Sequence, residues 1–407
     1  MIERLFDLSP RVIARALGAL TLMATVATAA HGAPFTPSSD DELVQRLPHR
    51  LDATARAQRT LAARHPEELR LATANARSAI ERARRFGDPR ELGIAQASLA
   101  HWWGLANPPP QVRLLRAIIR QSQHDFATAL VDLDFLASDA TPAVPLVVQA
   151  QAALTRASVL QVTGRLPDAQ LACEALLEPR FASLGAGLTI PARACVAELR
   201  SLRGHARDAA IELAGLAREA GADGWLALLR AELAERVGDA VTARAQFREA
   251  TALAGNAYTR GAYADWLLSQ GQARETLALL DADDAAADAD ALLLRRAIAL
   301  HRLHDARAPH LAETLAARFD AATQRGENFH AREQARFALD VLDQPAQALA
   351  LARTNWQHQK EPADALLLVR AAVAAGDAAA AEPVYERVRD AGWSDVRLAA
   401  AKRGVQQ

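Results

Sequence analysis

The chain has 407 residues, of which 51% are hydrophobic and 23% charged, and its formal net charge is -1 at pH 7. This length exceeds one ordinary compact domain, so several domains or a repeat array are expected. The apolar content excludes a disordered chain, and the near-neutral charge argues against nucleic-acid binding or a polybasic membrane surface. Aromatic residues are only 5% and alanine dominates the apolar set, which favours closely packed helices over strands.

The first 33 residues have the features of a secretory signal peptide. Three arginines precede an uncharged run from Ala16 to Ala30, which at about 15 residues is shorter than the roughly 20 that a spanning helix needs. Pro34 disfavours cleavage directly before it, so we expect cleavage near the small residues Ala29, Ala30, Gly32 and Ala33. An uncleaved membrane anchor is the alternative. The sequence predicts a periplasmic or secreted protein whose mature chain has no stable membrane insertion.

One spacing recurs along most of the chain. A small or apolar residue is followed seven positions later by a turn residue, and five positions after that by a small residue. The triplets are Ala117, His124, Ala129; Ala157, Gly164, Ala169; Ala197, Gly204, Ala209; Ala231, Gly238, Ala243; Ala264, Gly271, Thr276; and Val369, Gly376, Ala381. Sixteen positions after the first member of each triplet stand Leu133, Cys173, Leu213, Phe247, Leu280 and Tyr385. Steps of 33 to 40 residues between neighbouring units indicate helical hairpins stacked into a solenoid.

The clearest unit runs from Trp225 to Leu253. It predicts two helices joined by a turn at Gly238-Asp239, with Ala231 and Ala243 at the crossing point, where small side chains let two backbones approach closely. This unit resembles the tetratricopeptide repeat. The resemblance implies an all-α, right-handed α-solenoid with first helices on its concave wall, and a protein that binds a peptide or partner chain in that groove.

Some units depart from the spacing. Arg120 stands where the first unit should have an apolar residue. After Ala297 and the turn position His304, Pro309 and Glu313 stand where small and bulky residues belong. We therefore expect a longer helix or an inserted loop between His304 and Phe329.

Three consecutive prolines at 108–110 mark the expected start of the array. Near its end, the unit with its turn at Asp343 matches the repeat spacing only weakly. The expected division is a signal peptide and cleavage region (1–33), a linker (34–47), an N-terminal helical cap (48–110), a solenoid (111–300), an irregular helical segment (301–330) and C-terminal hairpins (331–407).

The outward face of the first helices predicts a docking surface. Successive units place carboxylates there, and two aromatic residues stand near the starts of these helices: Glu198, Trp225, Glu232, Glu235, Tyr258 and Asp265. Gln121, Gln161 and His301 would continue the wall. An acidic strip with aromatic flanks would suit a basic or arginine-rich extended ligand. The alternative is that these carboxylates are ordinary solvated positions paired with Arg200, Arg230 or Arg236.

The two cysteines stand on helices expected to be neighbours. Cys173 belongs to the second helix of one hairpin and Cys195 to the first helix of the next. A disulfide between them is geometrically plausible in an oxidising compartment, and two separate buried thiols are the alternative.

No catalytic motif is present in the sequence. It contains neither a glycine-rich phosphate loop nor a Gly-x-Ser-x-Gly elbow, so we expect a non-catalytic protein without cofactor or metal. One alternative is an enzyme or metal-binding protein with a site between His301 and His330, where His301, His304 and His310 could share a metal. A second is a self-assembling structural solenoid. The aspartates between Asp281 and Asp290 lack the glycine turn and terminal glutamate of a calcium loop.

Overall fold

The computed structural model describes residue 39 and residues 53–138, 144–282, 289–324 and 331–404. The residues predicted to form the signal peptide, most of the predicted linker, most of the aspartate-rich run, and His330 lie outside the described residues. Within the described ranges every regular element is a helix, and none of these helices is long and apolar enough to cross a membrane.

The helices follow one another along the chain with short connections. Their bounds are α2 (Ala53–Arg64), α3 (Leu69–Phe86), α4 (Arg90–Ser98), α5 (Ala100–Trp103), α6 (Pro110–Ser122), α7 (Phe126–Ala137), α8 (Leu146–Val162), α9 (Leu166–Glu174), η1 (Ala175–Leu177), η2 (Pro179–Leu184), α10 (Ala186–Ser201), α11 (Ala206–Ala220), α12 (Gly224–Val237), α13 (Ala240–Leu253), α14 (Ala257–Ser269), α15 (Ala273–Asp281), α16 (Asp290–Arg302), α17 (Ala308–Gln324), α18 (Ala331–Asp340), α19 (Pro345–His358), α20 (Pro362–Ala374), η4 (Ala378–Ala381), α21 (Glu382–Ala391) and α22 (Val396–Gly404).

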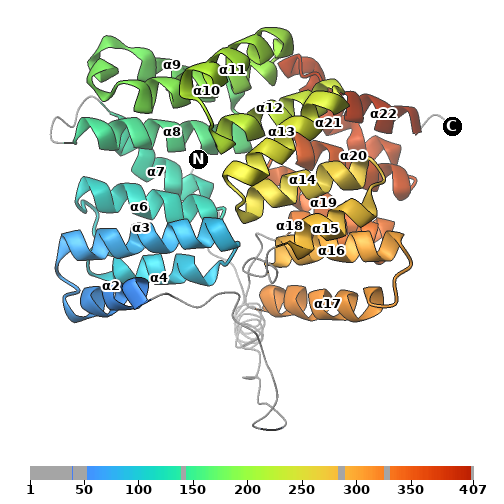
Figure 1. The fold of residues 1–407 in the computed structure, drawn as a ribbon, viewed down its shortest axis with the longest axis horizontal. Helices are drawn as coiled ribbons and strands as arrows, with labels where there is room; N and C mark the ends of the chain where they lie inside the picture. Colours follow the sequence, from blue (N-terminus) through green and yellow to red (C-terminus); the bar gives the residue numbers. More distant parts are fainter. Residues whose placement is uncertain (1–38, 40–52, 139–143, 283–288, 325–330, 405–407) are drawn as a thin grey trace, which may run out of the picture.

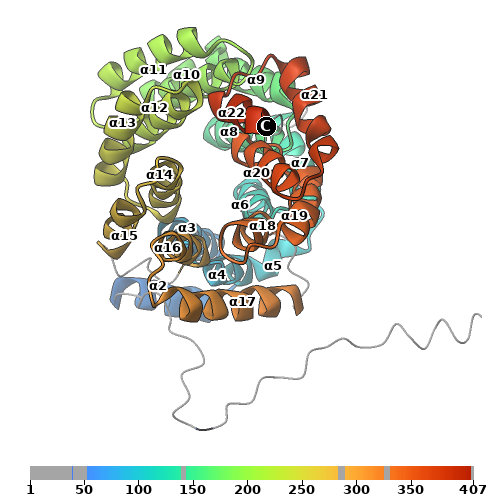
Figure 2. The same ribbon diagram turned by 90° about the vertical axis from the view of Figure 1, so that its right-hand side faces the viewer.

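Antiparallel hairpins pack against their neighbours in sequence order, as in an α-solenoid. The expectation of an all-α protein built from stacked hairpins is confirmed at this level. Seen along the axis of the array, α10, α12, α14, α18 and α20 form an inner layer (Figure 2). The outer layer consists of α11, α13, α15, α17, α19 and α21.

Each expected turn residue adopts the left-handed backbone conformation. The positive φ angles are 60° at His124, 82° at Gly164, 88° at Gly204, 82° at Gly238, 73° at Gly271, 52° at His304, 53° at Asp343 and 71° at Gly376. A left-handed residue ends one helix and reverses the chain into the next. His304 and Asp343, the turn residues of the two weak units, therefore reverse the chain as the glycines do. Gly87, between α3 and α4, has the same conformation, with φ 65°.

Small residues at the helix crossings are buried, as the spacing requires. Ala157, Ala231 and Ala243 have no exposed surface, and Phe247 fills the gap beside the last two. The segment after His304 is the exception. There α17 is a 17-residue helix, and Leu315 and Phe319 face the core while Pro309 and Glu313 are exposed. The expected longer helix is thus present, with its buried face in a different register.

Arg120, which breaks the apolar spacing, belongs to a buried ion cluster. Its Nη1 lies 2.9 Å from a carboxylate oxygen of Asp132 on α7. Arg113 and Arg116, also on α6, donate to the same carboxylate, which is 1% exposed. A buried carboxylate is tolerated only where charged partners compensate for its lost hydration. The polar residue at this position therefore joins α6 to α7 through charge.

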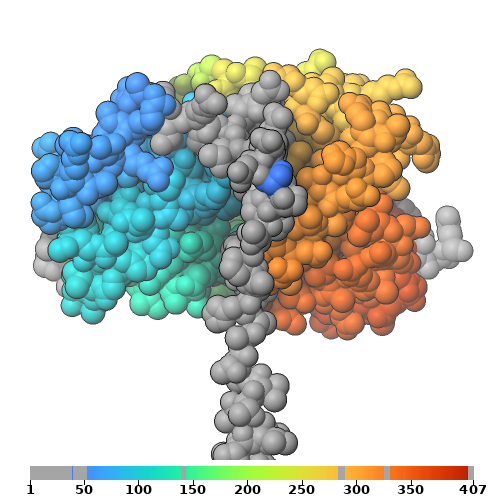
Figure 3. Space-filling model, turned by 90° about the horizontal axis from the view of Figure 1, so that it is seen from below, coloured from blue at the N-terminus to red at the C-terminus, as the bar shows by residue number. Residues whose placement is uncertain are grey.

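The array coils back along itself, so that its second half lies beside its first half. The hairpin turns of the first half meet elements of the second half in order, and we call this line of contacts the seam (Figures 1 and 2). In Figure 3 the N-terminal helices, blue to green, and the C-terminal helices, orange to red, lie on opposite sides of the lower face. The contacts run from Gly87 with Ala257 and Ala289, through His124 with Gln359, Gly164 with Arg387 and Gly204 with Gly392, to Gly238 with Val396.

Backbone and core atoms both cross the seam. The amide of Lys360 donates to the carbonyl oxygen of Val162 at 2.7 Å. One apolar core joins residues of α8, α9 and α10, such as Leu160 and Leu199, to Val384 and Trp393 near the C-terminus. The last hairpins are therefore part of the same packed body as the first ones.

Candidate functional site

The expected docking residues lie on three neighbouring inner helices. Glu198 belongs to α10, Glu232 and Glu235 to α12, and Asp265 to α14, all in the inner layer of Figure 2. We call these four carboxylates, with Trp225 and Tyr258, the inner-wall cluster.

Helix geometry brings the aromatic residues to the same wall. Trp225 precedes Glu232 by seven residues and Tyr258 precedes Asp265 by seven, so each aromatic lies two turns earlier on the same helix face. Capping fixes both helix starts, because Asp223 accepts from the amides of Trp225 and Leu226, and α14 is capped in the same way. The Tyr258 hydroxyl donates to Glu232 Oε1 at 3.1 Å, which joins α14 to α12.

Glu198 and Glu232 are the two carboxylates of the cluster that have no direct ion pair among the described residues. Gln161 donates to Glu198 at 2.8 Å. Desolvation and the Glu198 carboxylate raise the pKa of Glu232 to about 8, against the opposing effect of Arg236. Desolvation also raises the pKa of Glu198, again opposed by Arg236. At neutral pH Glu232 therefore exists largely as the protonated acid.

Asp265 and Glu235 are instead held by arginines of this chain. Asp265 pairs with Arg295 at 2.6 Å and with Arg336 at 2.7 Å. Desolvation acts against ionisation, but these two guanidinium groups outweigh it and lower the pKa of Asp265. Glu235 pairs with Arg397 across the seam at 2.9 Å.

The arginines that pair with the inner wall are thus not the ones considered from the sequence. Arg200 lines a different surface, and Arg236 is 5% exposed and donates to Ser201 at 2.7 Å. The pairing arginines follow later in the chain: Arg295 and Arg336 belong to the helices α16 and α18, and Arg397 on α22 comes from across the seam. Two of the four predicted carboxylates, Glu235 and Asp265, are consequently neutralised by arginines of the same chain.

The wall continues from Tyr258 to charged groups on the C-terminal hairpins. The Glu232 carboxylate is the main cause that raises the pKa of Tyr258, and Glu361 and Arg332 also act on it. Arg332 on α18 pairs with Glu361 at 2.7 Å and with Asp364 at 2.6 Å. The surroundings of Tyr258 are therefore polar on several sides, and its side chain is 62% exposed.

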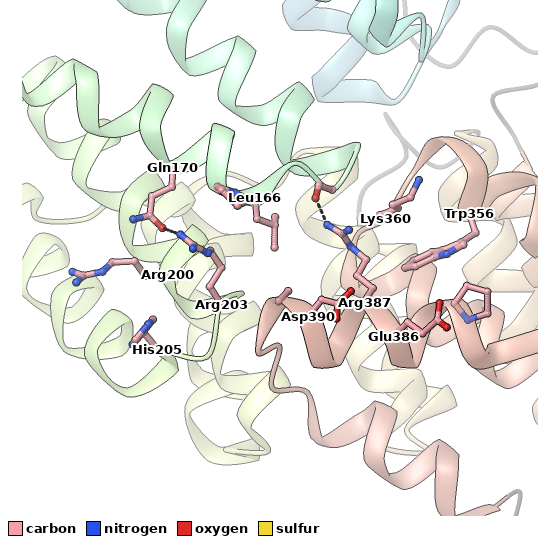
Figure 4. Close-up of a pocket in the computed structure, with 14 residues that line it drawn as sticks. Leu166, Gln170, Arg200, Arg203, His205, Trp356, Lys360, Glu386, Arg387 and Asp390 are labelled. Carbon is pink, nitrogen blue, oxygen red and sulfur yellow. Dashed lines mark hydrogen bonds between the residues drawn. The ribbon is translucent and has the colours of Figure 1, made fainter.

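A second candidate site lies at the seam, and we call it the seam pocket. It has a volume of about 590 Å³, and its walls come from α9, α10 and the turn after it on one side, and from the end of α19 and α21 on the other (Figure 4). Its charged and titratable lining consists of Arg200, Arg203, His205, Lys360, Glu386, Arg387 and Asp390. Sequence analysis missed it because its two walls are more than 150 residues apart in the chain.

Cys173 and Cys195 form a disulfide in the structure, with Cα atoms 6.0 Å apart. The bridge joins α9 to α10, which are the neighbouring helices that the repeat spacing indicated. Cys173 is fully buried. The described residues contain no cluster of three or more histidine, cysteine or acidic side chains arranged to hold a metal ion, and this includes His301, His304 and His310.

No protein-family model matches the chain, and no curated protein is significantly similar to it.

Proposed function

We propose that this protein is an exported, non-catalytic helical-repeat protein of the tetratricopeptide type, a right-handed solenoid that binds an extended segment of a partner protein on the inner-wall cluster. The observation that carries the proposal is the exposure of Tyr258, 62%, on an inner helix among charged groups. A large aromatic side chain left exposed beside polar groups is typical of binding surfaces.

The exposed part of the wall defines the ligand. Trp225 is 41% exposed at the start of α12, about 10 Å along that helix from Glu232. The carboxylates without an ion pair, Glu198 and Glu232, lie at the same end of the cluster, whereas Asp265 and Glu235 are already paired. A segment with one or two basic side chains and an apolar neighbour would complement this end of the wall.

Binding of a basic side chain at Glu232 should be coupled to proton release. A guanidinium or ammonium group favours the ionised carboxylate and lowers its pKa, which starts at about 8. At pH 7 the complex should therefore hold fewer protons than the separate partners. Calorimetric titration in two buffers of different ionisation enthalpy measures this release directly, and equal heats in both buffers would argue against docking at Glu232.

The direct test uses a fluorescent arginine- and alanine-containing peptide and the same peptide with glutamate in place of arginine. Trp225→Ala and Tyr258→Ala should each weaken binding of the arginine peptide at least about fivefold, because each removes exposed aromatic area. Val241→Ala on the outer helix α13, where the side chain is 84% exposed, is the matched control. Equal binding of both peptides, or no effect of the two aromatic variants, would remove the inner wall as the docking surface.

Affinity capture from the cell envelope tests the biological form of the proposal. Bait proteins should be wild type, the Trp225→Ala, Tyr258→Ala double variant and the Val241→Ala control. A partner recovered by wild type and control but lost with the double variant supports the proposal. Recovery of the same proteins by all three bait proteins would contradict the proposal.

A further inference from the structure

We propose that the seam pocket binds a multivalent oxyanion, a small molecule with two or more phosphate or carboxylate groups, which bridges the two halves of the array. This site is distinct from the inner-wall cluster and does not depend on the function proposed for it.

Cationic side chains line the pocket on both walls (Figure 4). Arg200 and Arg203 come from the α10 side, and Lys360 and Arg387 come from the C-terminal side. None of the four makes an ion pair within the described part of the chain. Their hydrogen bonds go to neutral acceptors: Arg203 donates to Gln170 at 2.7 Å, Lys360 to the carbonyl of Gln357 at 3.1 Å, and Arg387 to the carbonyl of Gly164.

The arrangement keeps like charges together. Desolvation, and after it the nearby Arg387 guanidinium, lower the pKa of Lys360. The Nε of Arg387 is buried without a hydrogen-bond partner, which is unfavourable for a polar group removed from water. Asp390 partly offsets the burial of Arg387, and Asp364 that of Lys360. Neither cation makes an ion pair with these carboxylates among the described residues, and an anion between the two cations would relieve their repulsion.

Two carboxylates also line the pocket, and they limit what fits. Glu386 and Asp390 are both exposed on α21. Four cations and two carboxylates leave an excess of two positive charges, without counting His205. A cationic ligand is therefore disfavoured, and a ligand with two or more negative charges matches the excess.

Size and shape favour a compact ligand. A volume of about 590 Å³ lies within the range of small-molecule sites. Arginine presents a planar fork that matches carboxylate and phosphate oxygens, whereas the lysine ammonium acts as a point charge. Because the cations stand on opposite walls, a ligand with separated anionic groups can contact both at once. Such a ligand would link the α9–α10 side to α21 across the seam.

The test uses tripolyphosphate and citrate as separate probes, so that phosphate and carboxylate ligands are distinguished. Calorimetry on the disulfide-bonded, signal-free chain should show saturable binding of at least one probe. Arg203→Gln on one wall and Lys360→Met on the other should each weaken it about tenfold or more. Arg389→Gln is the matched control, because Arg389 belongs to α21 but is exposed and pairs with Glu382 at 2.9 Å. Circular dichroism of each variant establishes that it is folded.

A second readout distinguishes bridging from binding to one wall. The Lys360 amide donates to the Val162 carbonyl across the seam, so a bridging ligand should slow its hydrogen exchange. Slower exchange that disappears in both wall variants supports the proposal. The proposal would be overturned if neither probe binds, if both variants bind with wild-type affinity, or if binding leaves the exchange of this amide unchanged.

Discussion

A Cβ atom added to Gly204 would lie 2.8 Å from the carbonyl oxygen of Gly392, 188 residues later in the chain. Gly204 is the turn residue between α10 and α11, and Gly392 ends α21, so two helix ends meet with no side chain between them. The two turns are therefore in close contact at the seam. This contact shows how a repeat turn can serve two purposes, because glycine permits both the left-handed conformation and the close contact.

Gly204→Ala should destabilise the protein more than the same change at Gly271. Both glycines have positive φ, 88° and 73°, which costs alanine about 1 kcal/mol or more. Only Gly204 has a backbone atom in the way, since nothing lies within 4 Å of an added Cβ at Gly271. We expect an additional loss of about 1–3 kcal/mol at Gly204, measured by urea unfolding. Equal losses in the two variants would mean that the seam contact does not form in solution.

The buried charge cluster between α6 and α7 predicts a large loss of stability when the Asp132 carboxylate is replaced by an amide. Asp132→Asn should destabilise the fold by about 3–5 kcal/mol, because it leaves Arg113 and Arg116 buried without their counter-charge. Asp134→Asn on the same helix is the control, since Asp134 is 56% exposed and pairs with Arg156 at the surface. Its expected cost is below about 1 kcal/mol. Thermal unfolding of the two variants side by side decides the matter, and similar melting temperatures would contradict the cluster.

Stability should fall with rising pH because of Glu232. Its folded-state pKa of about 8 is above the ordinary glutamate value of 4.5, so the folded protein binds the proton more tightly than the unfolded chain. The stabilisation is complete below about pH 4.5, is lost between pH 4.5 and 8, and is absent above. The slope from this one group is at most about 1.4 kcal/mol per pH unit.

Glu232→Gln should remove this slope and make the protein more stable than wild type at pH 9, with little difference at pH 5. Glu313→Gln, at an exposed position on α17, is the control and should change neither value. Chemical unfolding at pH 5, 7 and 9 provides the comparison. If the free energies of unfolding of wild type and Glu232→Gln change in parallel between pH 5 and pH 9, the raised pKa of Glu232 is contradicted.

The disulfide should stabilise the protein measurably. It closes a loop between residues 22 positions apart, for which chain entropy gives about 3 kcal/mol. Unfolding with and without a reducing agent should therefore differ, and thiol titration of the unfolded oxidised protein should find no free cysteine. A Cys173→Ala, Cys195→Ala variant is the control, because reducing agent should leave its stability unchanged. Two titratable thiols in protein purified under oxidising conditions would contradict the bridge.

The amino-acid spacing determined the hairpins. Small residues at fixed distances from a turn residue are a local property, since helix geometry sets which side chains meet within one hairpin and the next. For this reason even His304 and Asp343, in units with poor flanking residues, could be identified as turn positions, and both adopt positive φ. The same locality placed Glu198, Glu232 and Asp265 on neighbouring inner helices. It failed at α17, where Leu315 and Phe319 shift the buried face.

Only the tertiary structure decided which distant parts meet. Arg397 reaches Glu235, Arg336 reaches Asp265, and Arg387 reaches Gly164, over separations of 71 to 223 residues. These contacts depend on the rotation of each hairpin relative to the next, added over many hairpins. A local sequence pattern does not predict that total rotation. The coiling of the array consequently neutralises part of a strip that looks acidic in the sequence. It also creates the seam pocket from two walls that, taken separately, are ordinary helix ends.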